Sequence, residues 1–324
     1  MQTKLLHSYS ADTIGEYNWE KPEPRYDEIE VKTAFCGVCR SDIGSYARWE
    51  NMPYTDADNP NGKLGGFGHE GLGTVTKIGS KVTNVKVGDY VATWGDPAYA
   101  LYYNVKATDI AIIPSLEFKY ILQPVACAIN IAIKTLNMRN KLGFNGSIEN
   151  RNGDVLLIGT GFMSIIIGQY FNWRAIPYTV VGSSNKEEWQ KLGKNVVPIE
   201  NMMRSRRKFS TCIDLSSKAS TWNKFPDLIH TEGLICYAAT PSEPITTNFF
   251  EACWNCFNFI MPSPRNLDFS DMMQQTADLV ASNVIDPSFI WTKEYDRHDM
   301  DSVKEAFEDG KNRKPGYVRG YLKF

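Results

Sequence analysis

A cysteine, a histidine and a glutamate are the residues of this chain whose types point most directly to metal chemistry. Cys39 lies in the sequence GVCRSD, and His69 and Glu70 are adjacent in the glycine-rich sequence GFGHEGLG. Thiolate, imidazole and carboxylate together form a donor set that suits zinc. The surrounding glycines allow positive φ angles or close backbone approach, which a tight corner presenting both side chains requires. The alternative is a glycine-rich loop of a β-barrel with an accidental His-Glu pair.

Strand-like segments lie on both sides of these residues. The run from Glu28 to Phe35 leads into Cys36-Gly37-Val38-Cys39, which places a soft thiolate where the strand gives way to a loop. After the His-Glu pair, apolar and polar residues alternate as in half-buried strands, with breaks at Gly79-Ser80 and Gly88-Asp89. The apolar positions are Val75, Ile78, Val82, Val85, Val87 and Val91. Alternation resumes from Tyr99 to Pro114, so this part of the chain is predicted to form a β-rich domain.

The periodicity then changes to that of a helix. Ile121 to Met138 has apolar residues at helical spacing, with Pro124 near the start, where a missing N–H is tolerated. Residues 139–153 contain two Asn-Gly turns and are predicted to form a polar surface hairpin or loop without an assigned role. Asp154 to Ser164 is predicted to form a buried parallel strand, followed by a glycine turn and the start of a helix. Further strands are expected at Tyr178–Val181, Thr211–Leu215, Leu234–Ala239 and Phe257–Met261, with a helix at Lys186–Leu192. This alternation predicts a doubly wound parallel sheet.

The glycines after the buried strand indicate a dinucleotide site. Gly159 and Gly161 fill the first two positions of G-x-G-x-x-G, while Ser164 stands at the third, where close helix–strand packing is made. Phe162 and Met163 lie between, at the predicted helix start. A strand, a glycine turn and a helix N-terminus in this order suit the binding of a pyrophosphate.

The end of the second predicted strand, VVGSSNKEEW, bears on the choice of cofactor. An Asp or Glu there would hold the ribose 2′-hydroxyl of NAD, but no acid is present. Ser183, Ser184 and Lys186 instead offer hydrogen bonds and charge to a 2′-phosphate. The same turn is also explained by helix capping from Ser184 or Asn185. We expect NADP(H) to be the cofactor.

Two motifs together carry a family resemblance. GVCRSD followed by GHEGLGTVTKIGSKVTNVKVGDYV resembles the zinc-containing medium-chain alcohol dehydrogenase family, and SSNK resembles the NADP-binding turn of its cinnamyl alcohol dehydrogenase branch. The resemblance extends to the closing KPGYVRGYLKF. It implies an α/β fold with a GroES-like β-barrel catalytic domain formed by residues 1–121 and 265–324. Residues 122–264 are then the Rossmann cofactor-binding domain, a doubly wound parallel sheet.

The resemblance also implies roles for the residues of the first motifs. Cys39 and His69 would be ligands of one catalytic zinc ion, with Glu70 an outer or alternating ligand. Asp42 would orient the histidine by accepting its other N–H. Ser41 would hydrogen-bond the substrate oxygen and relay its proton.

Two arginines and two departures from the family complete this interpretation. Arg40 would reach the cofactor pyrophosphate, and Arg319 matches a position where the family places a basic residue near the cofactor, although a solvated strand charge explains it equally well. Gln123 stands where the family has a Cys, Asp or Glu as third zinc ligand, and a neutral amide oxygen is a poor substitute. Gly44 replaces a relay histidine, so protons are expected to leave through water or the cofactor ribose.

The seven cysteines do not form the even, dense framework of a secreted disulfide-rich domain, and reduced, mostly buried thiols are expected. Cys36 and Cys39 form one C-x-x-C pair and Cys253 and Cys256 another, so a four-cysteine structural zinc is an alternative. The aromatic sequence FFEACWNCFNFIM favours core cysteines leading into a buried strand. The family's separate cysteine-rich lobe has no counterpart in residues 93–104, so we expect no structural zinc.

Composition places the chain among soluble proteins with small-molecule partners. Its 324 residues, 43% hydrophobic and 22% charged, are enough for two domains. With 35 basic and 37 acidic residues, charge does not favour nucleic acid or a membrane surface, and we expect a cytoplasmic location. The segment Phe257–Met261 is either a buried strand or an edge strand pairing across a two-fold axis in a homo-oligomer.

The sequence therefore predicts a zinc-dependent oxidoreductase that transfers a hydride between NADP(H) and an alcohol, aldehyde or ketone. One alternative is a zinc-independent NADPH double-bond or quinone reductase of the same superfamily, favoured if Gln123 abolishes metal binding. Another is a cofactor-binding protein without turnover, to which Ser164, Gln123 and Gly44 point. The substrate stays unnamed, and Trp49 and Trp94 are expected to line its pocket or to pack in the core.

Overall fold

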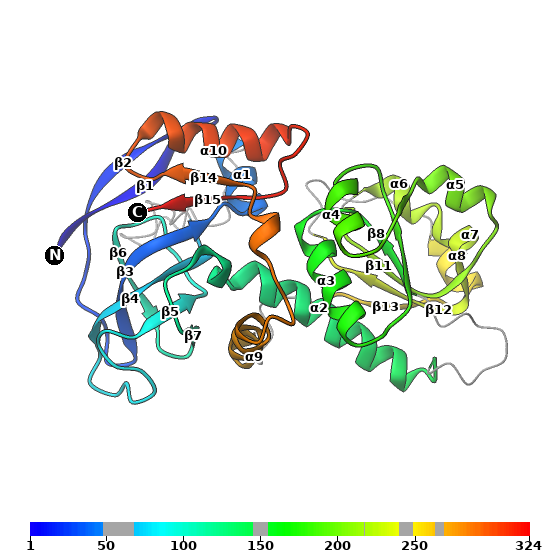
Figure 1. Cartoon of the computed structure of the whole chain (residues 1–324), viewed down its shortest axis with the longest axis horizontal. Coiled ribbons are helices and arrows are strands. Elements are labelled where there is room, and N and C mark those ends of the chain that lie inside the picture. Colours follow the sequence, from blue (N-terminus) through cyan, green and yellow to red (C-terminus); the bar gives the residue numbers. More distant parts are fainter. Residues whose placement is uncertain (48–67, 145–154, 217, 240–248, 263–268) are drawn as a thin grey trace. The chain divides into compact units, whose positions relative to one another are not determined.

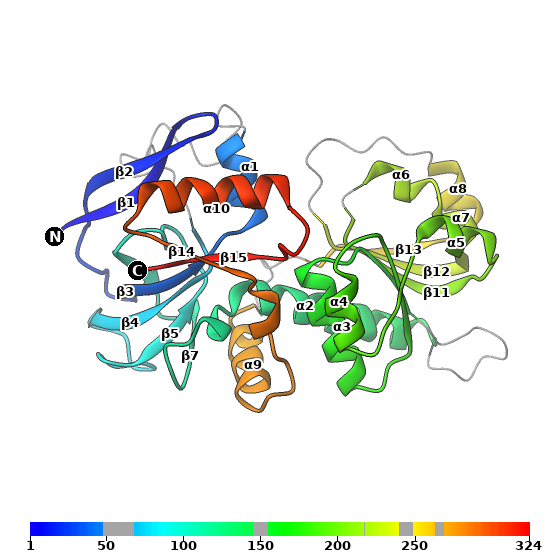
Figure 2. The ribbon, with the colours of Figure 1, turned by 45° about the horizontal axis from the view of Figure 1, so that its top comes forward.

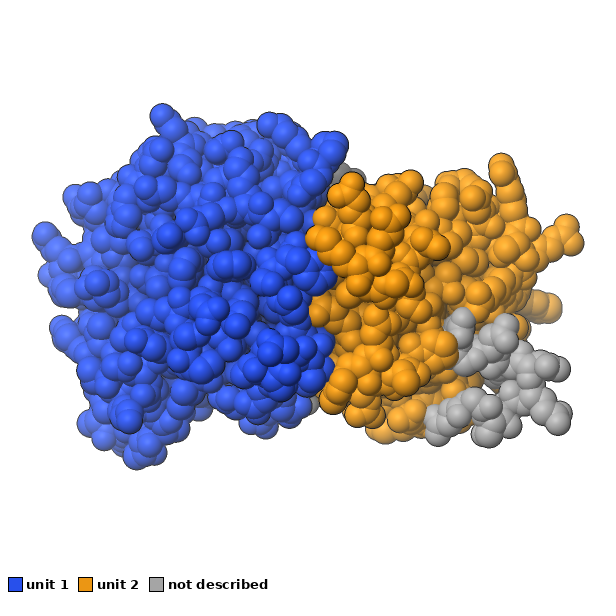
Figure 3. Space-filling model, viewed as in Figure 1, with its two compact units in different colours: residues 1–126, 270–324 blue, residues 127–269 orange. Residues whose placement is uncertain are grey.

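The computed structural model describes residues 1–47, 68–144, 155–216, 218–239, 249–262 and 269–324. The chain forms two compact units, one of residues 1–126 and 270–324 and one of residues 127–269 (Figures 1 and 3). These limits lie close to the expected boundaries at 121/122 and 264/265. Trp49 and most of the loop expected at 139–153 lie outside the described residues.

The first unit is built on a seven-stranded sheet that joins the two ends of the chain. Its strands run in the order β14-β15-β3-β4-β5-β7, and β6 also pairs with β3. The pairs are antiparallel except β14 with β15. The strands are β3 (Glu28–Gly37), β4 (Gly71–Ile78), β5 (Tyr90–Thr93), β6 (Tyr102–Lys106), β7 (Ile110–Ile112), β14 (Lys293–Asp296) and β15 (Gly320–Lys323). An N-terminal hairpin of β1 (Gln2–Ser10) and β2 (Thr13–Glu20) adds to this unit.

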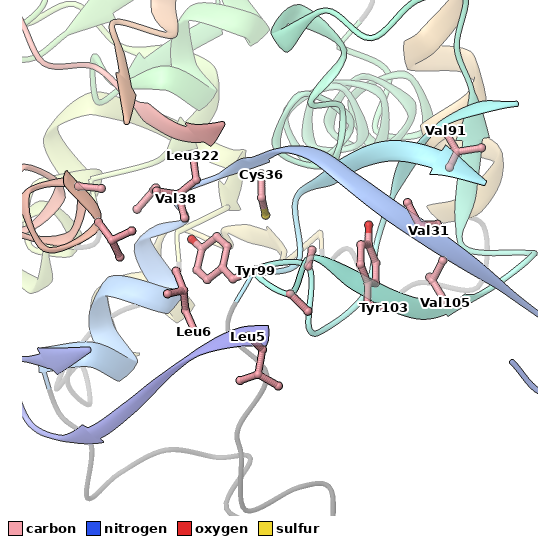
Figure 4. Packing of buried hydrophobic residues seen from close by; sticks show 14 of the residues in the cluster. Leu5, Leu6, Val31, Cys36, Val38, Val91, Tyr99, Tyr103, Val105 and Leu322 are labelled. Atoms are coloured by element: carbon pink, nitrogen blue, oxygen red, sulfur yellow. The ribbon is translucent and has the colours of Figure 1, made fainter. Parts of the chain in front are cut away.

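One hydrophobic core joins the hairpin, the sheet and a helix of this unit. Leu5 and Leu6 of β1 share a buried cluster with Val31 and Cys36 of β3 and with Tyr99 (Figure 4). The helix α10 (Met300–Asn312) runs beside β14 and β15 and adds its apolar face to the same cluster (Figure 2). Among the described residues, the helices α1 (Arg40–Ala47) and α9 (Phe269–Ala281) and the 3-10 turns Phe118–Tyr120 and Ser288–Ile290 also belong to this unit. The helix α2 (Gln123–Lys141) begins in this unit and continues into the second. The strand expected from Glu28 and the helix expected from Ile121 are thus present.

One expected strand in this unit is wrong. Residues 79–89 form turns between β4 and β5 rather than a strand with alternating valines. Their backbone groups bond to a turn and to β4: the Lys81 N–H donates to the Tyr26 carbonyl, and the Gly88 N–H donates to the Val75 carbonyl. Of the valines in this stretch, Val85 is buried, whereas Val87 is 57% exposed. The alternation was therefore incidental, because turn bonds already satisfy the backbone.

The second unit is the predicted doubly wound parallel sheet. Its strands run in the order β10-β9-β8-β11-β12-β13, and all pairs are parallel. The strands are β8 (Val155–Ile158), β9 (Tyr178–Val181), β10 (Val196–Val197), β11 (Phe209–Asp214), β12 (Ile229–Tyr237) and β13 (Asn258–Ile260). The helices are α3 (Phe162–Trp173), α4 (Lys186–Lys191), α5 (Ile199–Arg204), α6 (Ala219–Trp222), α7 (Phe225–Leu228) and α8 (Phe249–Trp254). Strand order reverses between β8 and β11, the point at which such sheets bind ligands.

Both faces of this sheet are buried, which explains its continuous apolar strands. All four residues of β8 are buried, and Leu156 and Ile158 share a core cluster with residues of α5 and α7. The buried stretch Ile165–Phe171 of α3 provides further apolar packing. Within the described residues, no helix combines the length and apolarity needed to cross a membrane.

The second C-x-x-C pair does not lie in the core, and the expectation drawn from its aromatic neighbours is wrong. Cys253 and Cys256 are both exposed, while Cys36, Cys212 and Cys236 are buried. Cys253 lies in α8 and Cys256 in the turn after it, so neither is part of β13. The aromatic residues misled the prediction because Phe249, Phe250 and Trp254 are themselves 62–74% exposed.

Candidate functional site

The pairing of β3 with β4 brings the candidate zinc ligands together. Cys36 near the end of β3 pairs with Gly71 at the start of β4, so Cys39 and the His69-Glu70 pair meet just beyond the paired ends. The donor atoms of Cys39, His69 and Glu70 lie within 4.8 Å of one another. Ligands that share a tetrahedral zinc at bonds of about 2.0–2.3 Å lie about 3.5 Å apart, so small movements would close the set on an ion.

Gly37 is required for this convergence. A Cβ atom on Gly37 would lie 2.1 Å from Oε2 of Glu70 and 2.9 Å from the ring of Trp291. The Gly37 N–H also donates to the backbone carbonyl of Glu70 at 3.1 Å. A glycine therefore lets the Glu70 carboxylate reach the cluster with its side chain fully buried.

Asp42 holds the imidazole of His69 from the side opposite the cluster. Nδ1 of His69 lies 3.4 Å from Oδ1 of Asp42 and 4.0 Å from Oδ1 of Asp96. Asp42 is itself held by a hydrogen bond from the Tyr99 hydroxyl to Oδ2, at 3.2 Å. Turning Nδ1 toward carboxylates leaves Nε2 for a metal, the arrangement in which an outer carboxylate fixes a ligand histidine.

The electrostatics of the site favour a bound cation. Burial disfavours charge on His69, but Asp42 and Cys39 more than offset it and raise the pKa of His69 well above its ordinary value. Burial raises the pKa of Asp96 to about 7 against the opposing effect of His69. A metal ion that replaces the imidazole proton would satisfy the same anionic surroundings.

Arg319 contacts the cluster itself. Its Nη2 donates to Oε1 of Glu70, and its side chain is only 11% exposed. Burial alone would lower the pKa of Arg319, yet Glu70 and Cys39 raise it above the ordinary value. The guanidinium also stacks over Trp291, 5.5 Å from the ring centroid. The alternative of a solvated strand charge is therefore wrong, while contact of Arg319 with a cofactor stays a prediction.

Ser41 contacts the cluster directly, and Gln123 is buried at the start of α2. The Ser41 hydroxyl donates to Sγ of Cys39 at 3.2 Å, so in this structure it bonds a ligand atom. Gln123 is the first residue of α2 and is 5% exposed. Its role as a metal ligand, like the role of Ser41 in proton relay, stays a prediction.

A third arginine that the sequence did not single out joins Arg40 and Arg319. Partial loss of hydration lowers the pKa of Arg313 although the residue is exposed, and the positive charges of Arg40 and Arg319 lower that pKa further. Arg313 follows α10 in a left-handed conformation, with φ of 47°, which turns the chain toward β15. The charges of these three guanidinium groups therefore interact with one another, and such a grouping would suit a multiply charged anion. The only signal in the sequence was the basic stretch KNRKPG before the closing strand.

The glycine turn of the second unit has the open backbone that a pyrophosphate needs. Gly159 has φ of 109° and lies against Leu215 at the end of β11, where a Cβ would come within 3.3 Å. At Gly161, the N-cap of α3, a Cβ would meet nothing within 4 Å. Phe162 and Met163 start the helix, so their N–H groups are among those without helical acceptors. Ser164, at the third motif position, is 1% exposed, which fits the need for a small side chain there.

The turn after β9 is bonded to this glycine turn rather than to its own helix. Ser184 Oγ lies 2.9 Å from Oγ1 of Thr160, and Nδ2 of Asn185 donates to the Thr160 carbonyl at 2.9 Å. Asn185 is the N-cap residue of α4, in a left-handed conformation, but its side chain makes no capping bond. The capping explanation is therefore wrong. Ser183, Ser184 and Lys186 remain exposed at this edge.

Comparison with known proteins agrees with both units. Residues 25–114 match the model of the alcohol dehydrogenase GroES-like domain. In sequence, the chain is 39% identical over 72 residues to YdjJ of Escherichia coli K12, an uncharacterised zinc-type alcohol dehydrogenase-like protein. That match covers 22% of this chain and 20% of the relative's length.

Solved structures match over the whole chain. An E. coli oxidoreductase/dehydrogenase of unknown specificity has a TM-score of 0.79 at 19% identity, over 100% of this chain and 99% of its own. A short chain alcohol dehydrogenase from E. coli CFT073, solved with NADH, has a TM-score of 0.79 at 18% identity, with the same coverage.

These findings define a protein with a GroES-like domain and a six-stranded Rossmann-type sheet, which confirms the predicted α/β fold class. Residues 25–114 are thus an alcohol dehydrogenase GroES-like domain, and the chain shares its fold with dehydrogenases of known structure.

Proposed function

We propose that this protein is a zinc-dependent oxidoreductase that transfers a hydride between NADP(H) and an alcohol, aldehyde or ketone. The observation that carries the proposal is the convergence of Cys39, His69 and Glu70, whose donor atoms lie within 4.8 Å of one another. Their chemistry fits zinc, and the outer carboxylate on His69 fits a metal ligand. Zinc held there would supply Lewis acidity toward a carbonyl oxygen, and the reduced nicotinamide would supply the hydride.

The chain's own residues would position the substrate and move its proton. Ser41 has a hydroxyl hydrogen directed at Cys39 Sγ, and rotation about χ1 would redirect it to a substrate oxygen at the same site. Such a donor stabilises charge that develops on the oxygen during hydride transfer. Asp42 would keep His69 in one tautomer, and Gly37 would keep Glu70 close to both.

Each unit carries residues that suit an anionic part of the cofactor. Gly159, Gly161 and the first N–H groups of α3 suit the pyrophosphate. Arg40, Arg313 and Arg319 would form the second anionic subsite, because their interacting positive charges suit a diphosphate. Ser183, Ser184 and Lys186 would contact the 2′-phosphate of NADP(H), in the absence of an acid at this edge.

The test combines metal analysis with turnover. Protein purified without chelator should contain about one zinc per chain, and NADPH absorbance should fall with aldehydes or ketones in a zinc-dependent way. Ser41→Ala should reduce turnover about 10²–10³-fold, as for the loss of an oxyanion donor. Ser45→Ala, in the same helix, serves as the matched control and should behave like the parent. Zinc content must be measured for both variants, because Ser41 also bonds Cys39. A zinc-loaded protein that binds NADPH but reduces no carbonyl would overturn the proposal.

One observation favours a second function, a zinc-independent NADPH double-bond or quinone reductase. Arg319 is a cation that already interacts with Glu70 and Cys39, and the expected third ligand is the neutral Gln123. If zinc is below about a tenth of an equivalent while enones or quinones are reduced, this function replaces the first.

A further inference from the structure

The C-x-x-C motif of residues 253–256 is separate from the proposed metal and cofactor sites, and it is exposed. Cys253 and Cys256 are both free thiols on the surface of the second unit. Residues 254 and 255 between them are Trp and Asn, and Trp254 is 74% exposed. A solvent-exposed pair of thiols at this spacing has no role in core packing, so its chemistry decides what it does.

The backbone brings the Cα atoms of Cys253 and Cys256 within the range that a disulfide can span. The Cys256 N–H donates to the Cys253 carbonyl at 3.0 Å, closing a four-residue turn. Such a turn places its first and last Cα atoms less than about 7 Å apart. Disulfides join cysteines whose Cα atoms are about 4.4–6.8 Å apart. The turn therefore satisfies the backbone requirement without rearrangement of the chain.

Hydrogen bonds to β12 fix this turn in place. The Glu232 N–H donates to the Asn255 carbonyl at 2.8 Å, and Nδ2 of Asn258 donates to the Glu232 carbonyl at 2.8 Å. The Phe257 N–H donates to the Ala252 carbonyl at 3.1 Å, which closes the end of α8. Because the bonds come from both sides of the turn, the thiols are held near each other before any reaction, and their mutual effective concentration is high.

We propose that Cys253 and Cys256 form a dithiol that closes reversibly to an intrachain disulfide when it reacts with a low-molecular-weight disulfide such as oxidised glutathione. One cysteine thiolate attacks a sulfur of the oxidant, forms a mixed disulfide and releases one glutathione thiolate. The second cysteine thiolate attacks the mixed disulfide at the cysteine sulfur and releases the other glutathione. The protein loses two protons and two electrons, which together are two hydrogen atoms, and the oxidant becomes two molecules of reduced glutathione.

The position of the disulfide gives it a structural consequence. Cys256 lies two residues before β13, the edge strand of the six-stranded sheet, and Phe257 between them packs against the core of the unit. A bond from Cys256 to α8 would restrain the start of this edge strand. Oxidation should therefore slow amide exchange in residues 256–260, while exchange in the central strand β11 stays unchanged.

The experiment titrates the full chain in buffers of reduced and oxidised glutathione, traps free thiols with an alkylating reagent and maps peptides by mass spectrometry. A peptide containing residues 253–256 should lose two hydrogen atoms and escape alkylation, and reductant should reverse the change. The equilibrium constant for closure should be at least about tenfold larger than in the urea-unfolded chain, because the folded turn holds the thiols together.

In the Cys253→Ser and Cys256→Ser variants, oxidation should each time stop at a mixed disulfide between glutathione and the remaining cysteine. Both cysteines are exposed, so neither change disturbs the core. The proposal is wrong if the parent forms only mixed disulfides, or if closure is no more favourable folded than unfolded.

Discussion

Nη2 of Arg319 donates a hydrogen bond to Oε1 of Glu70, inside the set of atoms that would bind zinc. Arg319 directly precedes β15 and Glu70 directly precedes β4, and both strands flank β3. The cation and a metal ion would thus interact with the same carboxylate and with Cys39. This relationship links the affinity for metal to the position of one arginine.

Arg319→Gln is expected to bind zinc more tightly than the parent. The variant removes a positive charge that competes for Glu70 and Cys39, and a gain of about tenfold, or ~1.4 kcal/mol, is the expected size. The zinc dissociation constant can be measured by competition with a chromophoric chelator. Arg319→Lys keeps the charge and should stay near the parent. Zinc binding that is unchanged or weaker in Arg319→Gln would show that the arginine supports the metal site instead.

Arg313→Gln is expected to weaken the binding of NADPH and of NADH by the same factor, about tenfold. Arg313 neighbours Arg40 and Arg319, so it should contact the diphosphate that the two cofactors share. Lys304→Gln, an exposed position on α10, is the matched control. Fluorescence titration at two salt concentrations should show a smaller salt dependence for Arg313→Gln only. Equal binding by Arg313→Gln and the parent would remove Arg313 from the cofactor site.

Lys186→Gln is expected to weaken the binding of NADPH and to leave the binding of NADH nearly unchanged. The parent should bind NADPH at least about tenfold tighter than NADH, a difference of ~1.4 kcal/mol. Lys186 is exposed at the start of α4, beside Ser184, which bonds the glycine turn through Thr160. Lys191→Gln, in the last turn of the same helix, is the control. If the parent binds both cofactors equally, this turn only links α4 to the glycine turn.

The sequence predicted those parts of the fold that depend on local pattern. Tyr178–Val181 was predicted with the bounds that the structure has, because a short apolar strand between turn residues is buried on both faces. The stretch 79–89 was predicted as a strand because its valines alternate, but alternation does not show where the backbone bonds go. The exposure of Cys253 and Cys256 was missed for a similar reason, since aromatic neighbours indicate a core only if they are themselves buried.

The candidate site likewise contains residues that the sequence predicted and residues that it missed. Cys39, His69 and Glu70 could be singled out because donor type and glycine spacing are visible in the sequence. The contact of Arg319 with Glu70 joins residues 249 positions apart, and only the strand order β15-β3-β4 brings them together. Arg313 was missed because its position depends on a left-handed residue after α10, which the sequence did not indicate.

A buried ion pair between Lys21 and Glu30, near the start of β3, gives the last predictions, on stability and pH. Nζ of Lys21 lies 2.7 Å from Oε2 of Glu30, with side chains 0% and 2% exposed. Lys21 also donates to the Asn104 side chain, and Thr76 donates to Oε1 of Glu30, both at 2.8 Å. Lys21→Met should lower the free energy of unfolding by up to about 3–5 kcal/mol, because it removes the buried cation of Glu30 and leaves only the more exposed Lys77, 3.7 Å from Oε2. The double variant Lys21→Met, Glu30→Leu should recover most of this loss, since no buried charge remains.

The same pair should make the first unit sensitive to acid. Burial alone would raise the pKa of Glu30, but the bonds from Lys21 and Thr76 lower it below the ordinary 4.5. A carboxyl whose pKa is lower in the folded than in the unfolded chain adds stability above the unfolded pKa, and this stability is lost as pH falls through the folded pKa. Urea unfolding at pH 7, 5 and 4 should therefore show the parent losing stability below pH ~4.5, with a smaller loss in Glu30→Gln. Parallel pH curves for the parent and Glu30→Gln would show that other carboxyl groups carry the acid sensitivity.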